Sequence, residues 1–276
     1  MRLRKRTTKI LIYFFLIFIA ILHSVPLLLM VLNTLRTDKQ IKVMPLSIPE
    51  TWEWGNYVAT WNAGKYGTAY LNSIFVSIFA IMIGTVIVLL AAYSVTRLDL
   101  PKKGLIIGYF IMGFSFPAFL YIIPTYFMFN RVGLVDNLWG LVFLYSAGQI
   151  PLNFVMVRAY LMGIPKSIDE ASYVDGCTPL TTIWYIIIPL ARPILTTVAL
   201  LIFVGVWNEF VFANTFIQAD SLRMVATRFV RFTSEWSSDL SRIYTAAAIS
   251  AGPILIIYAF LQQKFIEGMT QGGVKG

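Results

Sequence analysis

Five residues within otherwise apolar segments have side chains suited to binding a small hydroxylated solute. Gln149 and Asn153 are four residues apart, so they lie on one face of a helix. Trp207, Asn208 and Glu209 are consecutive. Amides and carboxylates pair with hydroxyl groups and aromatic faces stack on sugar rings, so these residues are candidates to line a solute pathway. The alternative for them is structural, as hydrogen bonds between helices or, for Glu209, solvation at an interface.

The sequence motifs of catalysis, metal binding and nucleotide binding are absent. One histidine, His23, cannot build a histidine-based metal site, and one cysteine, Cys177, cannot form an intrachain disulfide. No G-x-x-x-x-G-K-[ST], H-E-x-x-H or G-x-S-x-G pattern occurs. We therefore expect no enzymatic activity and no cofactor bound by this chain. Too few ionisable groups lie in the apolar segments for a proton relay, so either a partner supplies energy or the chain is a passive pore.

A second candidate site lies in the longest polar connection of the chain. Ser167 and Glu170 form an S-x-x-E pattern, which predicts a helix that begins with a capping box at Ser167. Gly176 is suited to the left-handed residue that ends such a helix, and Thr178-Pro179 predicts the start of another helix. A two-turn helix is marginal alone in water, and its acidic residues disfavour an anionic membrane surface. We expect it to dock in a groove of a partner protein; the alternative is a plain connector.

Composition and apolar runs predict an all-α polytopic membrane protein. Of 276 residues, 58% are hydrophobic and 13% are charged, about half the charged share of a soluble domain. A span needs about 20 mostly apolar residues, and six transmembrane helices are predicted. They comprise residues 10–32, 71–95, 105–129, 138–157, 193–212 and 244–261. We expect a single transmembrane domain, residues 1–276, with a cytosolic loop at 158–192. Prolines such as Pro117 and Pro124 predict broken helices, which indicate a pathway; the alternative is that proline is simply more frequent in membrane helices than in soluble ones.

The distribution of basic residues predicts the orientation. Five basic residues precede the first span, and Arg97, Lys102 and Lys103 lie between spans two and three, so both termini, Met1 and Gly276, are expected in the cytosol. Basic residues in the outer loops weaken this rule without reversing it. The net charge of +9 does not indicate nucleic-acid binding, because the basic residues form no continuous face.

The polar connection resembles a motif of ABC importer permeases. Glu170-Ala171-Ser172-Tyr173-Val174-Asp175-Gly176, followed by Ile186, Ile188 and Pro189, matches the spacing of E-A-A-x-x-x-G-x9-I-x-L-P, with Ser172 and Ile188 as conservative departures. The C-terminal stretch from Gln263 to Gly276, Trp207-Asn208-Glu209-Phe210 and Asn56-Tyr57 are similar to the carbohydrate subfamily. Over its whole length the chain resembles the MalG-type permease subunits of binding-protein-dependent ABC carbohydrate importers.

This resemblance implies that the chain forms half of the translocation pathway of an ATP-driven importer for a sugar or oligosaccharide. The implied location is a bacterial or archaeal plasma membrane, in contact with lipid. The implied partners are a second permease chain, a cytosolic ATPase dimer that binds ATP and Mg, and an external solute-binding protein. The residues implied to couple to the ATPase are Glu170, Ala171, Ser172, Asp175, Gly176 and Pro189. The alternatives are a polyol, glycerol phosphate or peptide as solute, or a passive channel or scaffold subunit.

Overall fold

The computed structural model describes the backbone of residues 2–233 and 239–271, with the side chains of 8–233 and 239–260. Met1 and Gly276, and the side chains from Gln263 onward, lie outside the described residues.

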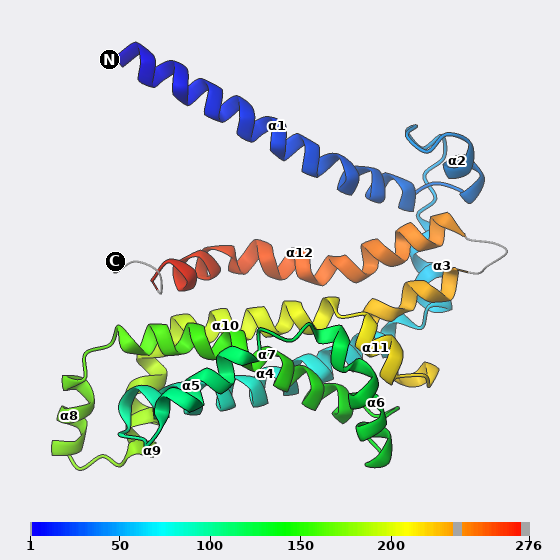
Figure 1. The fold of residues 1–276 in the computed structure, drawn as a ribbon. Helices are drawn as coiled ribbons and strands as arrows, with labels where there is room; N and C mark the ends of the chain where they lie inside the picture. Colours follow the sequence, from blue (N-terminus) through cyan, green and yellow to red (C-terminus); the bar gives the residue numbers. More distant parts are fainter. Residues whose placement is uncertain (1, 234–238, 272–276) are drawn as a thin grey trace. The chain divides into compact units, whose positions relative to one another are not determined.

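The described chain is helical, as predicted (Figure 1). In order, the helices are α1 (Arg2–Thr34), α2 (Asp38–Val43), α3 (Gly55–Ala63), α4 (Tyr66–Arg97), α5 (Lys103–Met112), η1 (Ala118–Tyr121), α6 (Ile122–Arg131), α7 (Leu138–Met162), α8 (Ser167–Val174), α9 (Pro179–Thr182), η2 (Ile183–Ile187), α10 (Ile188–Asn208), α11 (Val211–Phe216), η3 (Asp220–Leu222), η4 (Val225–Phe232) and α12 (Leu240–Gln271).

Five apolar helices in the described part of the chain are long enough to cross a membrane. They are Thr8–Thr34 of α1, α4, α7, the continuous stretch Pro179–Asn208 that ends in α10, and Leu240–Phe260 of α12. They cover five of the six predicted spans, although the fifth begins earlier than predicted and ends before Glu209. Along α1, apolar side chains such as Phe14 (71% exposed) are open on the surface, as expected for a helix that contacts lipid or another membrane chain.

The third predicted span, residues 105–129, is not one helix. α5 ends at Met112, residues 113–117 form turns, and η1 and α6 follow. Pro117 lacks an N–H group and disfavours helical backbone at the preceding Phe116, which explains the break. Pro124 lies in the first turn of α6, where proline is tolerated. The predicted break at Pro117 is therefore confirmed, whereas the break predicted at Pro124 is wrong, because α6 continues through that residue.

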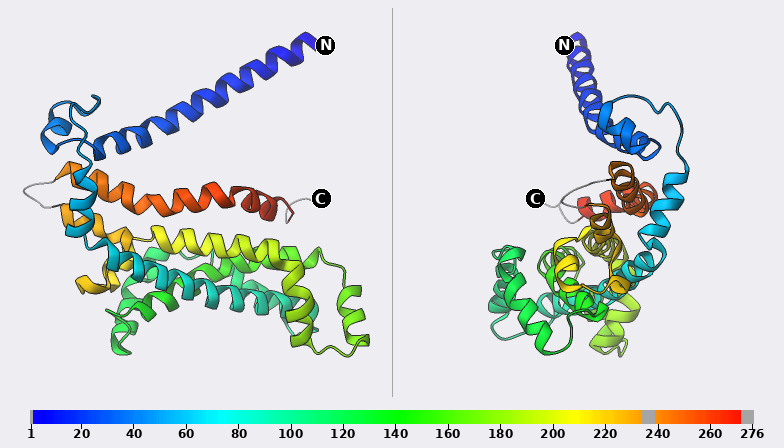
Figure 2. Two further views of the ribbon diagram at one scale, coloured as in Figure 1. Left: turned by 180° about the vertical axis from the view of Figure 1, so that it is seen from behind. Right: turned by 90° about the vertical axis from the view of Figure 1, so that its right-hand side faces the viewer.

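The chain divides into two compact units, and unit 2 comprises Thr68–Thr227 and Ile254–Gly276. Within unit 2, α7 packs against α5 and α10, and the helices run side by side (Figure 2). Gly84 of α4 permits a close approach to α10, since a Cβ there would lie 3.0 Å from Cδ1 of Ile202. Small residues have this role in membrane helix packing. The resulting core positions α8 and α9 at one end of unit 2 (Figure 1).

Unit 1 comprises Met1–Gly67 and Arg228–Pro253, and the residues after α1 fold around a buried arginine. The guanidinium of Arg36 donates to Oδ1 of Asn33 at 2.8 Å and to Oγ of Ser47 at 2.6 Å, and Nδ2 of Asn56 donates to the Arg36 carbonyl at 3.0 Å. Arg36 and Arg228 are each 1% exposed. Both arginines are thus part of the packed structure rather than free surface charge.

Candidate functional site

The helix predicted at Ser167 is present as α8, but it is not capped by a capping box. Lys166 occupies the N-cap position with helical dihedral angles (φ −64°, ψ −24°), and no side chain caps the helix. The N–H of Glu170 already donates to the Lys166 carbonyl at 3.1 Å. A side-chain cap needs extended backbone at the N-cap, so a chain that is helical before Ser167 leaves its hydroxyl no such role. The predicted capping box was wrong.

The end of α8 agrees with the prediction. Gly176 has a φ of +82°. Its N–H donates to the Tyr173 carbonyl at 3.1 Å, and the N–H of Cys177 donates to the Ser172 carbonyl at 2.9 Å. These two bonds and the left-handed glycine form a Schellman motif. No atom lies within 4 Å of the position that a Cβ would take at Gly176, so the backbone conformation and not lack of space requires glycine.

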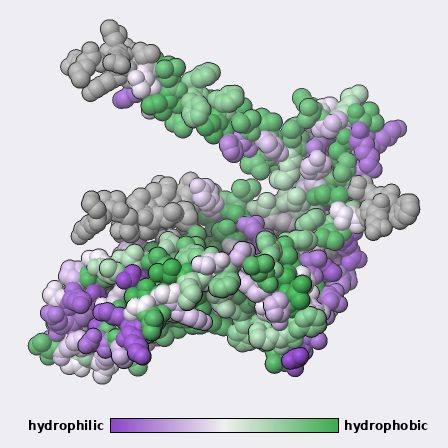
Figure 3. Space-filling view, in the orientation of Figure 1, coloured by the Kyte–Doolittle hydropathy of each residue, from purple (hydrophilic) through white to green (hydrophobic). Residues whose placement is uncertain are grey.

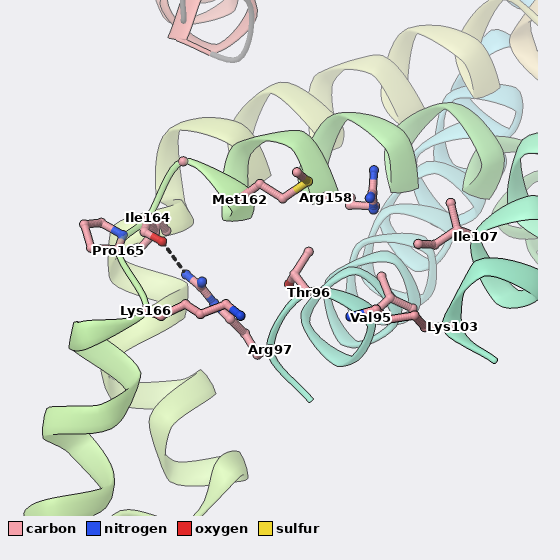
Figure 4. A pocket seen from close by; sticks show the side chains of 11 residues that line it. Val95, Thr96, Arg97, Lys103, Ile107, Arg158, Met162, Ile164, Pro165 and Lys166 are labelled. Carbon is pink, nitrogen blue, oxygen red and sulfur yellow. Dashed lines mark hydrogen bonds between the residues drawn. The ribbon is translucent and has the colours of Figure 1, made fainter. Parts of the chain in front are cut away.

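The inward face of α8 is held by a buried ion pair. Nε of Arg97, at the end of α4, lies 3.2 Å from Oδ2 of Asp169, and their side chains are 3% and 7% exposed. The guanidinium also donates to the Ile164 carbonyl at 2.9 Å (Figure 4), and the Tyr93 hydroxyl lies 3.5 Å from Oδ1 of Asp169. The loop is therefore fastened to the end of α4 by charge as well as by packing.

Ser172, where the family motif has alanine, joins α8 to the next helix. It is 2% exposed, and its hydroxyl donates to the Asp169 carbonyl at 2.7 Å and lies 2.9 Å from Oγ1 of Thr182. The start of α9 agrees with the prediction, because Thr178 caps it in a capping box with Thr181, followed by Pro179 at its first position. A buried pair of hydroxyl groups thus joins the two short helices.

A π-helical turn links α9 to α10. The N–H of Ile188 donates to the Ile183 carbonyl, five residues earlier, and the exposed Pro189 follows. Proline has no N–H and crowds the carbonyl four residues before it, so a wider turn relieves the conflict. The motif proline therefore lies at the start of α10, directly after the π-helical turn.

The outward face of the α8 region combines acidic and apolar side chains. Glu170, Ala171, Asp175 and Gly176 are exposed. Large apolar side chains accompany them: Val174 (87% exposed), Leu180 (65%), Trp184 (66%) and Tyr185 (78%). Hydrophilic residues gather at this end of unit 2, while hydrophobic residues cover much of its middle (Figure 3). Exposed apolar side chains rimmed by charge are typical of a protein docking surface.

At the other end of α10, Glu209 is engaged in structural hydrogen bonds. α10 ends at Asn208, and Glu209 has extended backbone (φ −73°, ψ 119°), so the prediction that Glu209 lies within the spanning helix was wrong. Its carboxylate accepts from the Tyr145 hydroxyl at 2.7 Å and from the N–H groups of Phe212 and Ala213, each at 3.0 Å. These amides lie in the first turn of α11, where a carboxylate satisfies unpaired N–H groups.

The remaining pathway candidates have different surroundings. Trp207 is 3% exposed, with its ring stacked on Phe203 at 5.3 Å, whereas Asn208 is exposed. Asn153 is fully buried and donates to the Gln149 carbonyl at 2.7 Å, while the half-buried Gln149 amide covers Gly205, leaving no room for a Cβ.

Three residues that hold these sites carry no signal in the sequence. Sequence patterns assign Arg97 only to membrane orientation and mark neither Tyr145 nor Thr182. Each holds its site through an ion pair or hydrogen bond with a residue ten or more positions away in the sequence.

Comparison with known proteins defines the class. Residues 84–271 match the family described as "Binding-protein-dependent transport system inner membrane component". The chain therefore belongs to this family of ABC transporter permeases and is a multi-pass membrane transport subunit, not an enzyme.

Individual relatives resemble the chain over nearly its full length. It is 32% identical to the probable ABC transporter permease protein YurM of Bacillus subtilis over 98% of this chain and 89% of that protein. It is 27% identical to the maltodextrin transport system permease protein MalD of Streptococcus pneumoniae, over 100% of this chain and 98% of the relative. A solved bacterial ABC transporter for import of the polysaccharide alginate shares the fold, with a TM-score of 0.83, 20% identity, and 94% and 97% of the two chains covered.

Proposed function

We propose that this permease subunit imports a sugar or oligosaccharide as one half of the translocation pathway, and that α8 is its contact with a separate ATPase. Relatives named as maltodextrin, trehalose and diacetylchitobiose permeases support the carbohydrate class. ATP and Mg belong to the ATPase dimer, and an external solute-binding protein delivers the solute. The chain as a whole, residues 1–276, acts as one membrane domain in this proposal.

The observation that carries the coupling role is the division of the α8 region into two faces. Asp169 and Ser172 fasten it inward, whereas Glu170, Ala171, Asp175 and Gly176 are left on the surface. A rigidly held helix can transmit a movement of the partner to the rest of the chain, whereas a flexible connector would not. Pro189, at the junction with α10, is where such a movement enters the membrane helix.

The break at residues 113–117 supports a second permease chain or a water-filled pathway. All five residues are exposed, and their backbone is not helical. Irregular backbone at membrane depth is tolerated where protein covers it or water reaches it, but not where lipid does. We propose that α5 and α6 together make one crossing beside that surface, which gives six crossings and places both termini in the cytosol. Reporter fusions at Gly276 and Asp220 test this, since activity of the Gly276 fusion outside the membrane would contradict it.

Among the five pathway candidates, exposure separates two roles. We assign solute contact to Asn208 and the half-buried Gln149. Trp207, Asn153 and Glu209 are assigned to positioning, because burial or hydrogen bonds within the chain occupy them.

The proposal is tested by purification and uptake. When this chain carries an affinity tag, the ATPase should copurify, and substituting Glu170 and Asp175 by lysine should release it while the membrane level of the chain is unchanged. In vesicles with the binding protein, labelled oligosaccharide should enter only when ATP is present. Entry without ATP would identify a passive channel, and ATP-dependent uptake of a polyol, glycerol phosphate or peptide alone would correct the solute class.

A further inference from the structure

Of the five long apolar helices in the described part of the chain, α4 alone contains no proline. α1, α7 and α12 each contain one, and the stretch that ends in α10 contains Pro189 and Pro193 after its π-helical turn. Proline removes a backbone hydrogen bond and is a common cause of a bend in a helix. α4 therefore runs over 32 residues without the points at which the other long helices can bend.

One end of α4 is attached to α8 by two side chains on the same face. Tyr93 and Arg97 are one turn apart on α4, and Asp169 and Tyr173 are one turn apart on α8. Besides the Arg97–Asp169 ion pair, the Tyr93 hydroxyl lies 3.4 Å from the Tyr173 hydroxyl. Arg97 also donates to the Ile164 carbonyl, just before α8 (Figure 4). A displacement of α8 would therefore act directly on the end of α4.

The other end of α4 is attached to the residues that link η3 to η4. Nδ2 of Asn72 donates to the carbonyls of Ser221 and Arg223, at 2.9 and 3.1 Å. Oγ of Ser73 accepts from the N–H of Val225 at 2.9 Å. Asn72 is 8% exposed and Ser73 is 1% exposed, so both attachments are buried. The same helix thus holds two segments that are distant in the sequence.

The distance between the two attached ends exceeds the thickness of a hydrocarbon core. Asn72 and Arg97 are 25 residues apart, or about 38 Å at the rise of a helix, whereas the core is about 30 Å thick. α4 runs from the α11 end of unit 2 to the α8 end (Figure 1). On the proposed orientation, the 221–225 segment is therefore outside the membrane and α8 is in the cytosol.

We propose that α4 is a rigid connection that transmits movement between α8 and the 221–225 segment, with Arg97 and Asn72 as the positioning residues at its two ends. This rests on the proposed function, in which α8 contacts the ATPase. α10 is a second route from α8, but it can bend at the π-helical turn and at Pro193. Rigid elements carry coupling between distant sites, and such coupling is reciprocal. Closure of the ATPase should therefore shift the 221–225 segment, and a binding protein acting outside should alter ATP hydrolysis through α4.

The first test measures how strongly the loaded binding protein stimulates ATP hydrolysis by the complete complex in vesicles. Arg97→Leu/Asp169→Leu removes the attachment at α8 without leaving a buried charge unpaired, and Asn72→Ala removes the attachment at the other end. Each should lower the stimulation at least about fivefold, while the ATPase still copurifies. Ser94→Ala is the control, because the Ser94 hydroxyl donates to the Leu90 carbonyl of the same helix, and it should leave the stimulation unchanged. Unchanged stimulation in either of the other variants would overturn the proposal.

A combined variant distinguishes transmission along α4 from two separate local effects. If both attachments belong to one route, Arg97→Leu/Asp169→Leu/Asn72→Ala should retain as much stimulation as the more impaired of its two parents. Independent substitutions this far apart are instead additive in free energy, so their fold reductions would multiply. A reduction equal to that product would overturn the proposal.

A second measurement follows α4 without the binding protein. Hydrogen–deuterium exchange of the peptide that contains Val225 is compared in the nucleotide-free complex and in the complex closed with a non-hydrolysable ATP analogue. In the unmodified complex, closure should change the exchange rate at least about fivefold, and Arg97→Leu/Asp169→Leu should abolish this change. No change in the unmodified complex, or the same change in both, would overturn the rigid connection. Absence of the ATPase from the purified unmodified complex would contradict the proposed function instead.

Discussion

The two ends of α10 show opposite uses of acidic residues next to a helix break. At the α8 end, Glu170 and Asp175 remain on the surface, and Asp169 alone turns inward to Arg97. At the α11 end, the Glu209 carboxylate accepts hydrogen bonds from a tyrosine hydroxyl and two backbone amides. The acidic residues at the α8 end are therefore mostly exposed on a surface, whereas the acidic residue at the α11 end stabilises the bend between α10 and α11.

This difference distinguishes residues that are exposed to a partner from residues that stabilise the fold. A family motif contains both kinds, because a docking helix needs an anchor as well as a contact face. Substitutions at anchored positions should change stability, and substitutions at exposed positions should change association.

The largest effect is expected from breaking the anchor of α8. Asp169→Leu leaves the Arg97 guanidinium buried without its counterion, which should destabilise the packed loop by about 3–5 kcal/mol. The double variant Arg97→Leu/Asp169→Leu removes both charges and should recover much of this stability. Thermal unfolding of the purified complex measures both. If the double variant is no more stable than the single one, the ion pair does not anchor α8.

Altering the Schellman glycine should have the next largest effect. Gly176→Leu imposes a left-handed conformation on an ordinary residue at a cost of about 1–2 kcal/mol and adds bulk to the docking face, so ATPase association and uptake should fall about 5–30-fold while membrane insertion is unchanged. Gly176→Asn is the matched control, because asparagine tolerates this backbone conformation and should retain most activity. Wild-type uptake by Gly176→Leu would contradict the docking assignment.

A substitution of Glu209 tests whether the acidic residue at the α11 end of α10 has a structural role. Glu209→Gln keeps one acceptor oxygen but loses the charge that serves two amides and the Tyr145 hydroxyl, so the complex should lose about 1–2 kcal/mol of stability. Uptake per assembled complex should remain close to normal. Solute uptake and complex yield, measured together, distinguish the roles, because lost uptake at full yield would make Glu209 a solute ligand.

The smallest effect is expected at Ser172. Ser172→Ala restores the alanine of the family motif and removes the contact with Thr182, which should cost about 0.5–1.5 kcal/mol of stability with little change in uptake. Ala171→Ser places the same hydroxyl on the exposed face and should leave stability unchanged. If Ser172→Ala lost more uptake than Gly176→Leu, the assignment of Ser172 to anchoring and of Gly176 to the contact face would be wrong.

Local chemistry explains what the sequence could predict. Gly176 and Thr178-Pro179 act through hydrogen bonds to residues within five positions, so their roles are visible as short patterns. The all-helical class and five spans follow from apolar run length alone. The pairs Tyr93–Asp169 and Tyr145–Glu209 join residues 76 and 64 positions apart, and no one-dimensional pattern records such contacts. The predicted capping box failed for a related reason, since backbone already helical at Lys166 overrode a matching pattern.

The interruption between α5 and α6 also constrains how the chain is made. Each of these helices has ten residues and so covers about 15 Å, half of a hydrocarbon core. Neither helix alone is long enough to cross the hydrocarbon core. α5 packs on α7, and Tyr126 of α6 packs on Phe216 of α11, both synthesised later. We therefore expect the packing of this stretch to be completed only after residue 216 has been synthesised.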